Sequence, residues 1–433
     1  MKNFFFLSLF LLPHFVQAQS GMTLDECIRL AWKQNPSVRN SVIDIKEARA
    51  DYMAAVGAFL PRAAVNAETG KRFGRSIDPD TNGYTNETFE EGTVGLDMTL
   101  SLFEGFSRIH QVHFRKMNKE RSEWALKNKQ NELAYQVTDA YYKLILERKL
   151  LNLALEQSRL SERYLKQTEA FVELGLKSAS DLQEVKARRE GDIYRYQSRE
   201  NSSRIALLHL KQLMNIQPGD TLAILDTITA SQLPPYSVST VETLYAQSIE
   251  ILPSIRMIDL KQKAAHKEYA IAGGAFSPSV FARFTVGSNY YNTAFSARQL
   301  RDNIGKYVGV GISFPLLSGL QRLTNQRKLK LNMYRLKNEE ELEKQQLYTD
   351  IEQTLLSLHT GYSEHQQALS QLDAETLVLK ESERKWEEGL ISVFQLMEAR
   401  NRFIAAKAEL VRVRLQIEMM MKLEKYYRQG TFL

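Results

Sequence analysis

The feature that most constrains this chain is a long stretch without helix breakers. No proline occurs between Gly319 and Gly389, which are 70 residues apart. Within this stretch, mostly apolar positions recur at alternating steps of four and three, the spacing of a helix packed lengthwise against other helices. These positions are Ile351, Leu355, Leu358, Tyr362, His365, Leu369, Leu372, Thr376 and Leu379. A continuous helix of this length would span about 105 Å, which no compact globular domain requires.

The same spacing resumes after Gly389, so the chain is expected to turn back there and form a helical hairpin. The second run consists of Leu396, Ala399, Phe403, Ala406, Leu410, Val413, Ile417 and Met420.

The first half of the chain repeats the second, which indicates an internal duplication. A shift of 214 residues places Gly105 on Gly319 and Gly175 on Gly389. A shift of 217 places Pro36-Ser37-Val38-Arg39 on Pro253-Ser254-Ile255-Arg256. We therefore predict two structural repeats, 19–235 and 236–433, with long hairpins at 105–215 and 319–428.

Each repeat also contains two predicted strands, at about 62–72 and 93–103 in the first and about 279–288 and 307–316 in the second. Segment 93–103 alternates strictly, with apolar Val94, Leu96 and Met98 on one face and small or polar residues on the other. A strand of a soluble sandwich would need a second apolar layer, which the flanking helices and polar loops do not offer. The pattern fits a membrane β-barrel better, and because four strands cannot close a barrel, other copies must supply the rest.

The N-terminus and the overall charge bound the cell compartment and the partners. Residues 1–18 combine an early lysine, an apolar run and a small residue at Ala18, which predicts a secretory signal peptide. Removing Lys2 leaves 56 basic and 51 acidic residues, a net charge of +5 instead of +6. The basic residues alternate with glutamates along the helices, so we expect solvated faces and no nucleic-acid partner.

No pattern of catalytic or metal-binding residues is found. The 7 histidines are scattered, and His359 and His365 are spaced so that they do not share a helix face as ligands. Cys27 lies beside Leu24 and Ile28, and we interpret it as a small buried apolar side chain. The sequence therefore predicts no enzyme, no cofactor and no metal site.

The order and spacing of these features resemble the outer membrane efflux protein family, the TolC-like channels. The resemblance rests on the duplicated helix starts, on the strand-to-helix junctions Leu100-Ser101-Leu102-Phe103-Glu104-Gly105 and Ser313 to Gly319, and on the hairpin turns Glu173-Leu174-Gly175-Leu176 and Glu387-Glu388-Gly389-Leu390. It implies a mixed α and β membrane protein. The expected architecture is a homotrimeric channel-tunnel with a 12-stranded outer-membrane β-barrel, four strands per chain, continuous with a periplasmic α-helical coiled-coil barrel.

The resemblance also implies a function and partners. Such a protein is the outer-membrane exit duct of a tripartite efflux or type I secretion system in a Gram-negative bacterium. It conducts substrates passively, contacts outer-membrane lipid, and docks on a periplasmic adaptor tied to an inner-membrane pump of the RND or ABC type. The alternative is a periplasmic coiled-coil scaffold or adhesin without a channel, which would have no reason for strands facing lipid.

Residues near the hairpin turns are the candidate functional residues. In the family, two acidic positions at the periplasmic aperture match Gln395 and Glu398, and a tyrosine and an aspartate of the closed-state latch match Trp386 and Asp181. The latch arginine position holds Ile391. The alternative for Asp181 and Glu398 is a solvated acid at a helix start, where negative charge is favoured.

The hairpin turns themselves are the expected docking site for the adaptor. We expect Gly175, Leu176, Gly389 and Leu390 to contact it. Turn geometry alone would also demand the two glycines.

Overall fold

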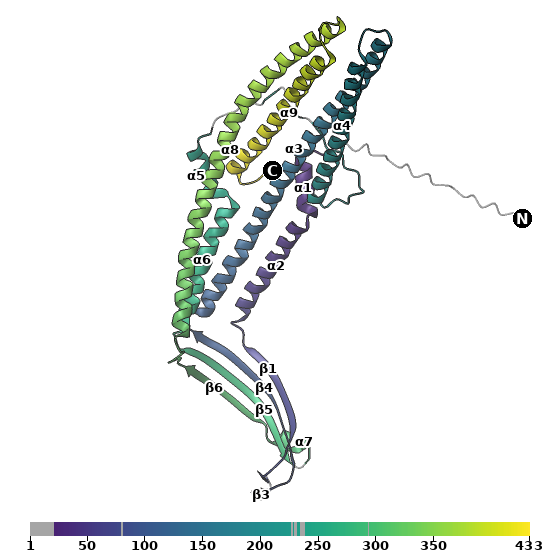
Figure 1. The fold of residues 1–433 in the computed structure, drawn as a ribbon. Helices are drawn as coiled ribbons and strands as arrows, with labels where there is room; N and C mark the ends of the chain where they lie inside the picture. The colour runs from purple at the N-terminus through teal and green to yellow at the C-terminus, as the bar shows by residue number, and fades with distance from the viewer. Residues whose placement is uncertain (1–20, 79–80, 227, 229–231, 234–238, 293) are drawn as a thin grey trace, which may run out of the picture. The chain divides into compact units, whose positions relative to one another are not determined.

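The computed structural model describes residues 21–433 apart from 79–80, 227, 229–231, 234–238 and 293, so the predicted signal peptide lies outside the described residues. Figure 1 shows long helices and one main sheet, a mixed α and β protein. The helices are α1 Leu24–Gln34, α2 Pro36–Gly57, α3 Ser107–Glu173, α4 Ala179–Leu213, α5 Val241–Ile251, α6 Pro253–Gly274, α7 Ala297–Asp302, α8 Gln321–Glu387 and α9 Val393–Gln429. The strands are β1 Arg62–Arg72, β2 Ser76–Ile77, β3 Tyr84–Thr85, β4 Phe89–Glu104, β5 Ser279–Asn292 and β6 Gly305–Ser313.

The chain divides into two compact units. The hairpin unit contains the residues up to Arg39, Gln130–Leu244 and Ile351–Leu433, and the sheet unit contains Asn40–Lys129 and Tyr245–Asp350. The helices α3 and α8 contribute residues to both units. Each compact unit therefore combines segments from both predicted sequence repeats.

The helices α3 and α8 are equal in length. Each has 67 residues, and α8 begins and ends 214 positions after α3, since 321 − 107 and 387 − 173 are both 214. The return helices α4 and α9 have 35 and 37 residues. This offset is the one that the turn glycines predict.

In the described part of the chain, no helix has the length and apolar character needed to cross a membrane.

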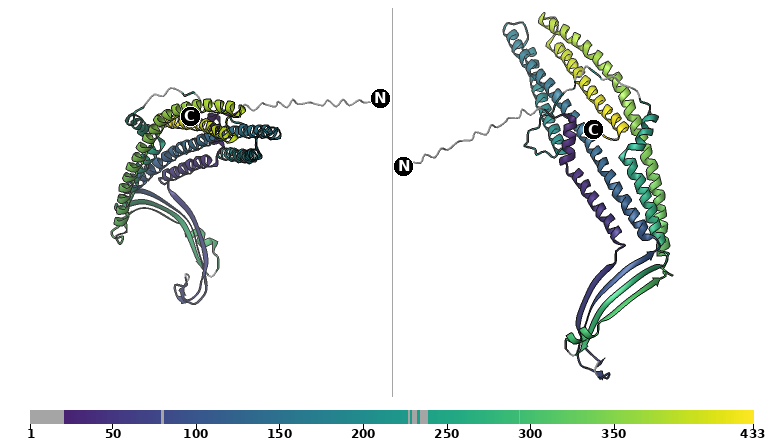
Figure 2. Two further views of the ribbon diagram at one scale, coloured as in Figure 1. Left: turned by 45° about the horizontal axis from the view of Figure 1, so that its top comes forward. Right: turned by 180° about the vertical axis from the view of Figure 1, so that it is seen from behind.

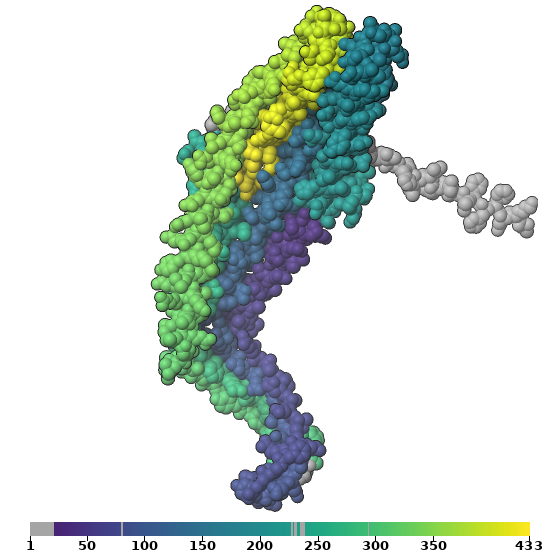
Figure 3. All heavy atoms as spheres, in the orientation of Figure 1, coloured from purple at the N-terminus to yellow at the C-terminus, as the bar shows by residue number. Residues whose placement is uncertain are grey.

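The predicted seam of α8 packs against α9. Leu358 has no exposed surface and contacts Val413 and Ile417, and Figure 3 shows the two helices in contact along the hairpin. Gly361 lies under Ile417, where an added Cβ would approach Ile417 Cγ1 to 2.9 Å. Thr376 departs from the prediction because it is exposed, and its hydroxyl donates a hydrogen bond to the Leu372 carbonyl one turn earlier.

Cys27 on α1 is completely buried, as are Ile28 and Ala31. Burial raises the pKa of its thiol to about 12, so it stays protonated at neutral pH and is a poor nucleophile. This confirms Cys27 as a small buried side chain.

The main sheet is antiparallel, with the strand order β1-β4-β5-β6. Its register gathers apolar residues on one face, because side chains alternate along each strand. That face includes Val65, Leu96, Met98, Phe284, Val286, Val308 and Val310. The opposite face carries Gly95, Asp97, Thr285, Gly287 and Gly305. The long helices of this unit run away from one end of the sheet, and Figures 1 and 2 show none of them across its faces.

Several strand bounds differ from the prediction. β4 begins at Phe89 instead of 93 and β5 continues to Asn292 instead of 288, and the rings of Phe89 and Tyr291 stack there with centroids 4.8 Å apart. Part of the predicted polar loops is therefore sheet, and the rest includes β2, β3 and α7. β6 ends at Ser313 instead of 316, because Pro315 has no N–H for the ladder.

We predict that Leu358→Ala lowers the free energy of unfolding by about 2–5 kcal/mol, because it opens a cavity in the seam. The matched control is Leu356→Ala, two residues away with a side chain 61% exposed, which should cost within about 0.5 kcal/mol. Denaturant unfolding in detergent, followed by circular dichroism, measures both. Equal losses would show that the seam does not stabilise the hairpin.

Candidate functional site

The two hairpins end in the same turn. Gly175 and Gly389 have left-handed backbones, with φ of +72° and +76°. The N–H of the following leucine, Leu176 or Leu390, donates to the carbonyl five residues earlier at 2.8 Å, and each glycine N–H donates to the carbonyl three residues earlier at 3.0 Å. This pair of bonds satisfies the last carbonyls of α3 and α8 and requires a residue without a Cβ. An added Cβ would meet nothing within 4 Å at either glycine, so turn geometry and not close packing selects them in this chain.

A capping box starts each return helix. The Asp181 carboxylate accepts from the Ser178 N–H at 3.0 Å, and the Ser178 hydroxyl accepts from the Asp181 N–H at 3.1 Å. In α9, Ser392 and Gln395 exchange the equivalent bonds at 3.0 and 3.3 Å. Asp181 and Gln395 therefore occupy the same position of two equivalent caps. The Ser-x-x-Asp/Gln spacing in the sequence is the signal that predicts this role.

The cap also keeps Asp181 charged. The backbone N–H and the hydroxyl of Ser178 lower the pKa of its carboxyl group. This favours the helix-start interpretation of Asp181 that the sequence analysis left open.

Trp386 is buried in an aromatic cluster. Its ring meets Tyr164 edge-on at 5.1 Å and lies 6.1 Å from Phe171. Leu379, Leu396 and the partly buried Ile391 complete the cluster. The indole N–H has no hydrogen-bond partner in the described chain, so it does not bond to Asp181 within one chain.

Glu398 lies six residues beyond the Ser392 cap. Its side chain is 55% exposed and pairs with Arg402 one turn later at 3.5 Å. An exposed pair of this kind is weak but reduces the local negative charge. Glu398 is therefore available to solvent, although it is partly compensated.

A groove of about 260 Å³ separates α4 from α9 near the turns, and Glu398 forms part of its wall. Its apolar side is the buried cluster of Val185, Val393 and Met397. Its polar side includes Arg188 and Asn401.

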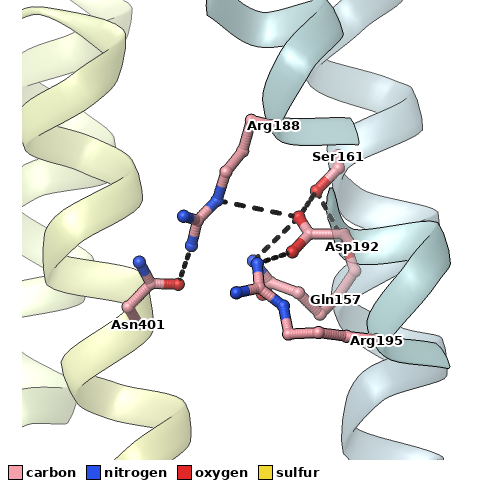
Figure 4. A network of polar contacts seen from close by, with 6 residues as sticks. All are labelled: Gln157, Ser161, Arg188, Asp192, Arg195 and Asn401. Atoms are coloured by element: carbon pink, nitrogen blue, oxygen red, sulfur yellow. Dashed lines mark hydrogen bonds and ion pairs between the residues drawn. The ribbon is translucent and has the colours of Figure 1, made fainter. Parts of the chain in front are cut away.

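A buried network of polar contacts joins α3, α4 and α9 beside this groove (Figure 4). Asp192 has no exposed surface, and its carboxylate accepts hydrogen bonds from the Ser161 hydroxyl and from Gln157 Nε2 and pairs with Arg195. Arg188 Nε lies 3.9 Å from the same carboxylate, while its Nη2 donates to Asn401 of α9. Arg188 thus connects the two hairpins. The sequence analysis missed this network, although Asp192 lies one heptad after Val185 and an acid at such a seam position is a signal.

The small and polar face of the sheet is the second candidate surface. Arg283 pairs with Asp97 at 3.2 Å, and Asn66 donates to the same carboxylate at 3.1 Å. On β6, the rings of Tyr307 and Phe281 lie over Gly309 and Gly311, where an added Cβ would clash at 2.3 and 2.5 Å. The face is concave, and its hollow measures about 820 Å³.

Within the ranges that the structure describes, no three His, Cys, Asp or Glu side chains are placed to hold a metal ion.

Comparison with known proteins identifies the family. The profile of the outer membrane efflux protein family matches residues 27–215 and 244–419, which is most of the chain. The chain therefore belongs to this family, whose members are outer membrane channels and not enzymes. A sequence search of curated proteins finds no match.

Solved structures confirm the fold at low sequence identity. The CmeC outer membrane channel of Campylobacter jejuni aligns with a TM-score of 0.83 at 15% identity, covering 94% of this chain and 85% of CmeC. VceC, an outer membrane protein of Vibrio cholerae, aligns with a TM-score of 0.79 at 15% identity, covering 95% and 97%. The MtrE outer membrane channel of Neisseria gonorrhoeae in its open state aligns with 0.75 at 17% identity, covering 95% and 89%.

We predict that Asp192→Asn lowers the free energy of unfolding by about 3 kcal/mol, because it leaves Arg188 and Arg195 without their buried counter-charge. The control is Glu190→Gln on the same helix, whose side chain is 67% exposed and whose loss should cost less than about 1 kcal/mol. Denaturant unfolding compares the two variants. A similar small loss in both would mean that the network contributes little to stability.

Proposed function

We propose that three copies of this chain form an outer-membrane channel that conducts substrates passively out of the periplasm of a Gram-negative bacterium. The observation that carries the proposal is the sheet. It has four strands, its edge strands are β1 and β6, and one of its faces is apolar. In lipid the backbone groups of both edges need partners, so other copies must pair with them. Three copies supply twelve strands.

The strand dimensions and the two faces fit this role. The 14 residues of β5, at about 3.3 Å each and a tilt of about 45°, rise about 33 Å, close to the hydrocarbon thickness of a bilayer. The apolar face would contact lipid. The face with Asp97, Arg283 and the glycines would line a wet lumen, which the small side chains leave open.

The helical hairpins would continue the duct into the periplasm and dock on an adaptor tied to an inner-membrane pump of the RND or ABC type. In support, Leu176 and Leu390 at the two turns are 65% and 68% exposed. Exposed leucines beside a rigid, fully capped turn suit a protein contact.

The assembly is tested in detergents that preserve β-barrels. We expect a stable trimer by light scattering and ion conductance in planar bilayers, because the strand edges pair only between copies. A monodisperse monomer would contradict the channel. A trimer without conductance would favour the scaffold or adhesin.

The docking surface is tested by Leu176→Asp and Leu390→Asp. We expect export to be abolished, because a charge replaces the exposed apolar contact, while trimer yield and thermal stability stay near wild type. Export assays in cells, with trimer yield as the control, measure this. Normal export by both variants would remove the turns from the adaptor interface.

The aperture is tested by conductance block from the periplasmic side. Three Glu398 carboxylates near a three-fold axis would attract multivalent cations, since low-dielectric walls focus the field. We expect Glu398→Gln to nearly eliminate the block. Gln395→Asp should strengthen it without harming the helix start, because Asp181 serves in the equivalent cap. An unchanged block in Glu398→Gln would place the mouth elsewhere.

A further inference from the structure

Large apolar side chains are exposed at all four connections between the main sheet and the helices that meet one end of it. These connections join α2 to β1, β4 to α3, α6 to β5 and β6 to α8, and they all lie in the sheet unit. Their exposed fractions are 67% for Leu60, 60% for Phe106, 43% for Phe276, 96% for Leu317 and 68% for Leu320. We call these five residues the junction belt. They lie outside the strands, so strand pairing in a barrel does not account for their exposure.

A β-bulge directs one part of the belt toward the apolar face of the sheet. Up to Ser101, β4 alternates regularly against β5, and then the register shifts so that Phe103 pairs with Val280. The extra residue Leu102 therefore puts Phe103 on the same face as Val280, which is the apolar face. Phe106 contacts Phe103 edge-on, with ring centroids 5.2 Å apart. The belt thus continues the apolar face beyond the strand end.

The backbone at two belt positions is strained. Phe106 and Leu320 have φ of +62° and +66°, directly after Gly105 and Gly319, which are also left-handed. This conformation is unfavourable for bulky residues, and glycine would relieve it. Both sites nevertheless hold a large apolar side chain that the chain itself leaves exposed. The strain is therefore retained for a contact outside the chain.

The two long helices begin with basic segments directly after the belt. From 107 to 119 in α3 and from 321 to 338 in α8 the sequence contains no Asp or Glu. The basic residues of these segments are Arg108, Arg115, Lys116 and Lys119 in α3 and Arg322, Arg327, Lys328, Lys330, Arg335 and Lys337 in α8. Arg108 pairs with Glu104 and Arg115 with Asp51, whereas Arg327, Lys328 and Lys330 are exposed. We call these three the basic collar.

The spacing of belt and collar matches a bilayer surface. Arg327 and Lys330 lie six and nine residues after Gln321, about 9 and 14 Å along the helix. The polar headgroup region is about 5–8 Å deep on each side of the hydrocarbon. Long basic side chains extend back toward it. An apolar belt followed by positive charge is the arrangement that binds anionic lipid surfaces.

We propose that the junction belt and the basic collar form a membrane-interface surface that binds a leaflet of anionic phospholipids. The inference rests on the proposed membrane insertion of the sheet, because that insertion places the belt at the bilayer boundary. The competing occupant of the belt is a second copy of this chain.

The belt is tested by lipid-dependent quenching. In a Cys27→Ala background, Leu317→Cys and Val310→Cys are labelled with a small fluorophore and reconstituted into vesicles that contain brominated phospholipids. Leu377→Cys on α8, where the native side chain is 69% exposed, serves as the aqueous control. We expect quenching at 310 and 317 and none at 377.

The outcomes separate this inference from the proposed function. Quenching at 310 without quenching at 317 would overturn the inference and indicate that another copy covers the belt. The absence of quenching at both positions would contradict membrane insertion itself, and with it the inference.

The collar is tested by lipid preference. Full-length protein in mixed micelles is titrated with fluorescent phosphatidylglycerol or phosphatidylcholine. We expect the triple variant Arg327→Gln/Lys328→Gln/Lys330→Gln to weaken phosphatidylglycerol binding by at least about tenfold, from the loss of three surface charges, and to leave phosphatidylcholine binding unchanged. The control variant Lys166→Gln/Lys177→Gln/Lys186→Gln has the same net charge and alters only the hairpin unit. Equal binding of phosphatidylglycerol by both variants would overturn the role of the collar.

Discussion

The four-stranded sheet leaves hydrogen bonds that one chain cannot make, and most of the architecture depends on this. β1 and β6 each have one edge without a strand beside it, and in an apolar solvent every unpaired N–H or C=O is costly. The flat apolar face adds to the demand, because no helix of the unit covers it. A chain of this kind is completed by copies of itself and by lipid, and the exposed residues at the end of the sheet extend that requirement to the bilayer surface.

The helices solve a different problem with local chemistry. A 67-residue helix is stable only where one side is packed along its length, and the seam around Leu358 and Ile417 supplies this packing. The turns are almost entirely determined by local bonds. Gly389 and Leu390 satisfy the end of α8, and Ser392 and Gln395 satisfy the start of α9. Because the turns need no support from elsewhere, their exposed leucines are free to serve as a contact surface.

Buried polar groups mark the contact between the two hairpins. Asp192 and Arg188 connect α4 to α9, and Trp386 packs on Tyr164 of α3 with an unsatisfied indole N–H. Such groups favour one arrangement of the helices over others, because a shift would leave charges buried without partners. This contact is therefore more specific than an apolar seam of the same area.

The sequence by itself determined whatever depends on local periodicity. The heptad spacing predicted both long helices, the shift of 214 residues predicted their equal length, and strict alternation predicted the two faces of β4. The buried position of Cys27 followed from its apolar neighbours on one helix face. Only the tertiary structure decided where the strands end, since Phe89 and Tyr291 meet across a pair of strands that are far apart in the sequence. It also decided that Gln395 is a cap, that Trp386 is buried and that Asp192 and Arg188 join two hairpins. These depend on which side chains meet in space, and no period along the chain encodes that.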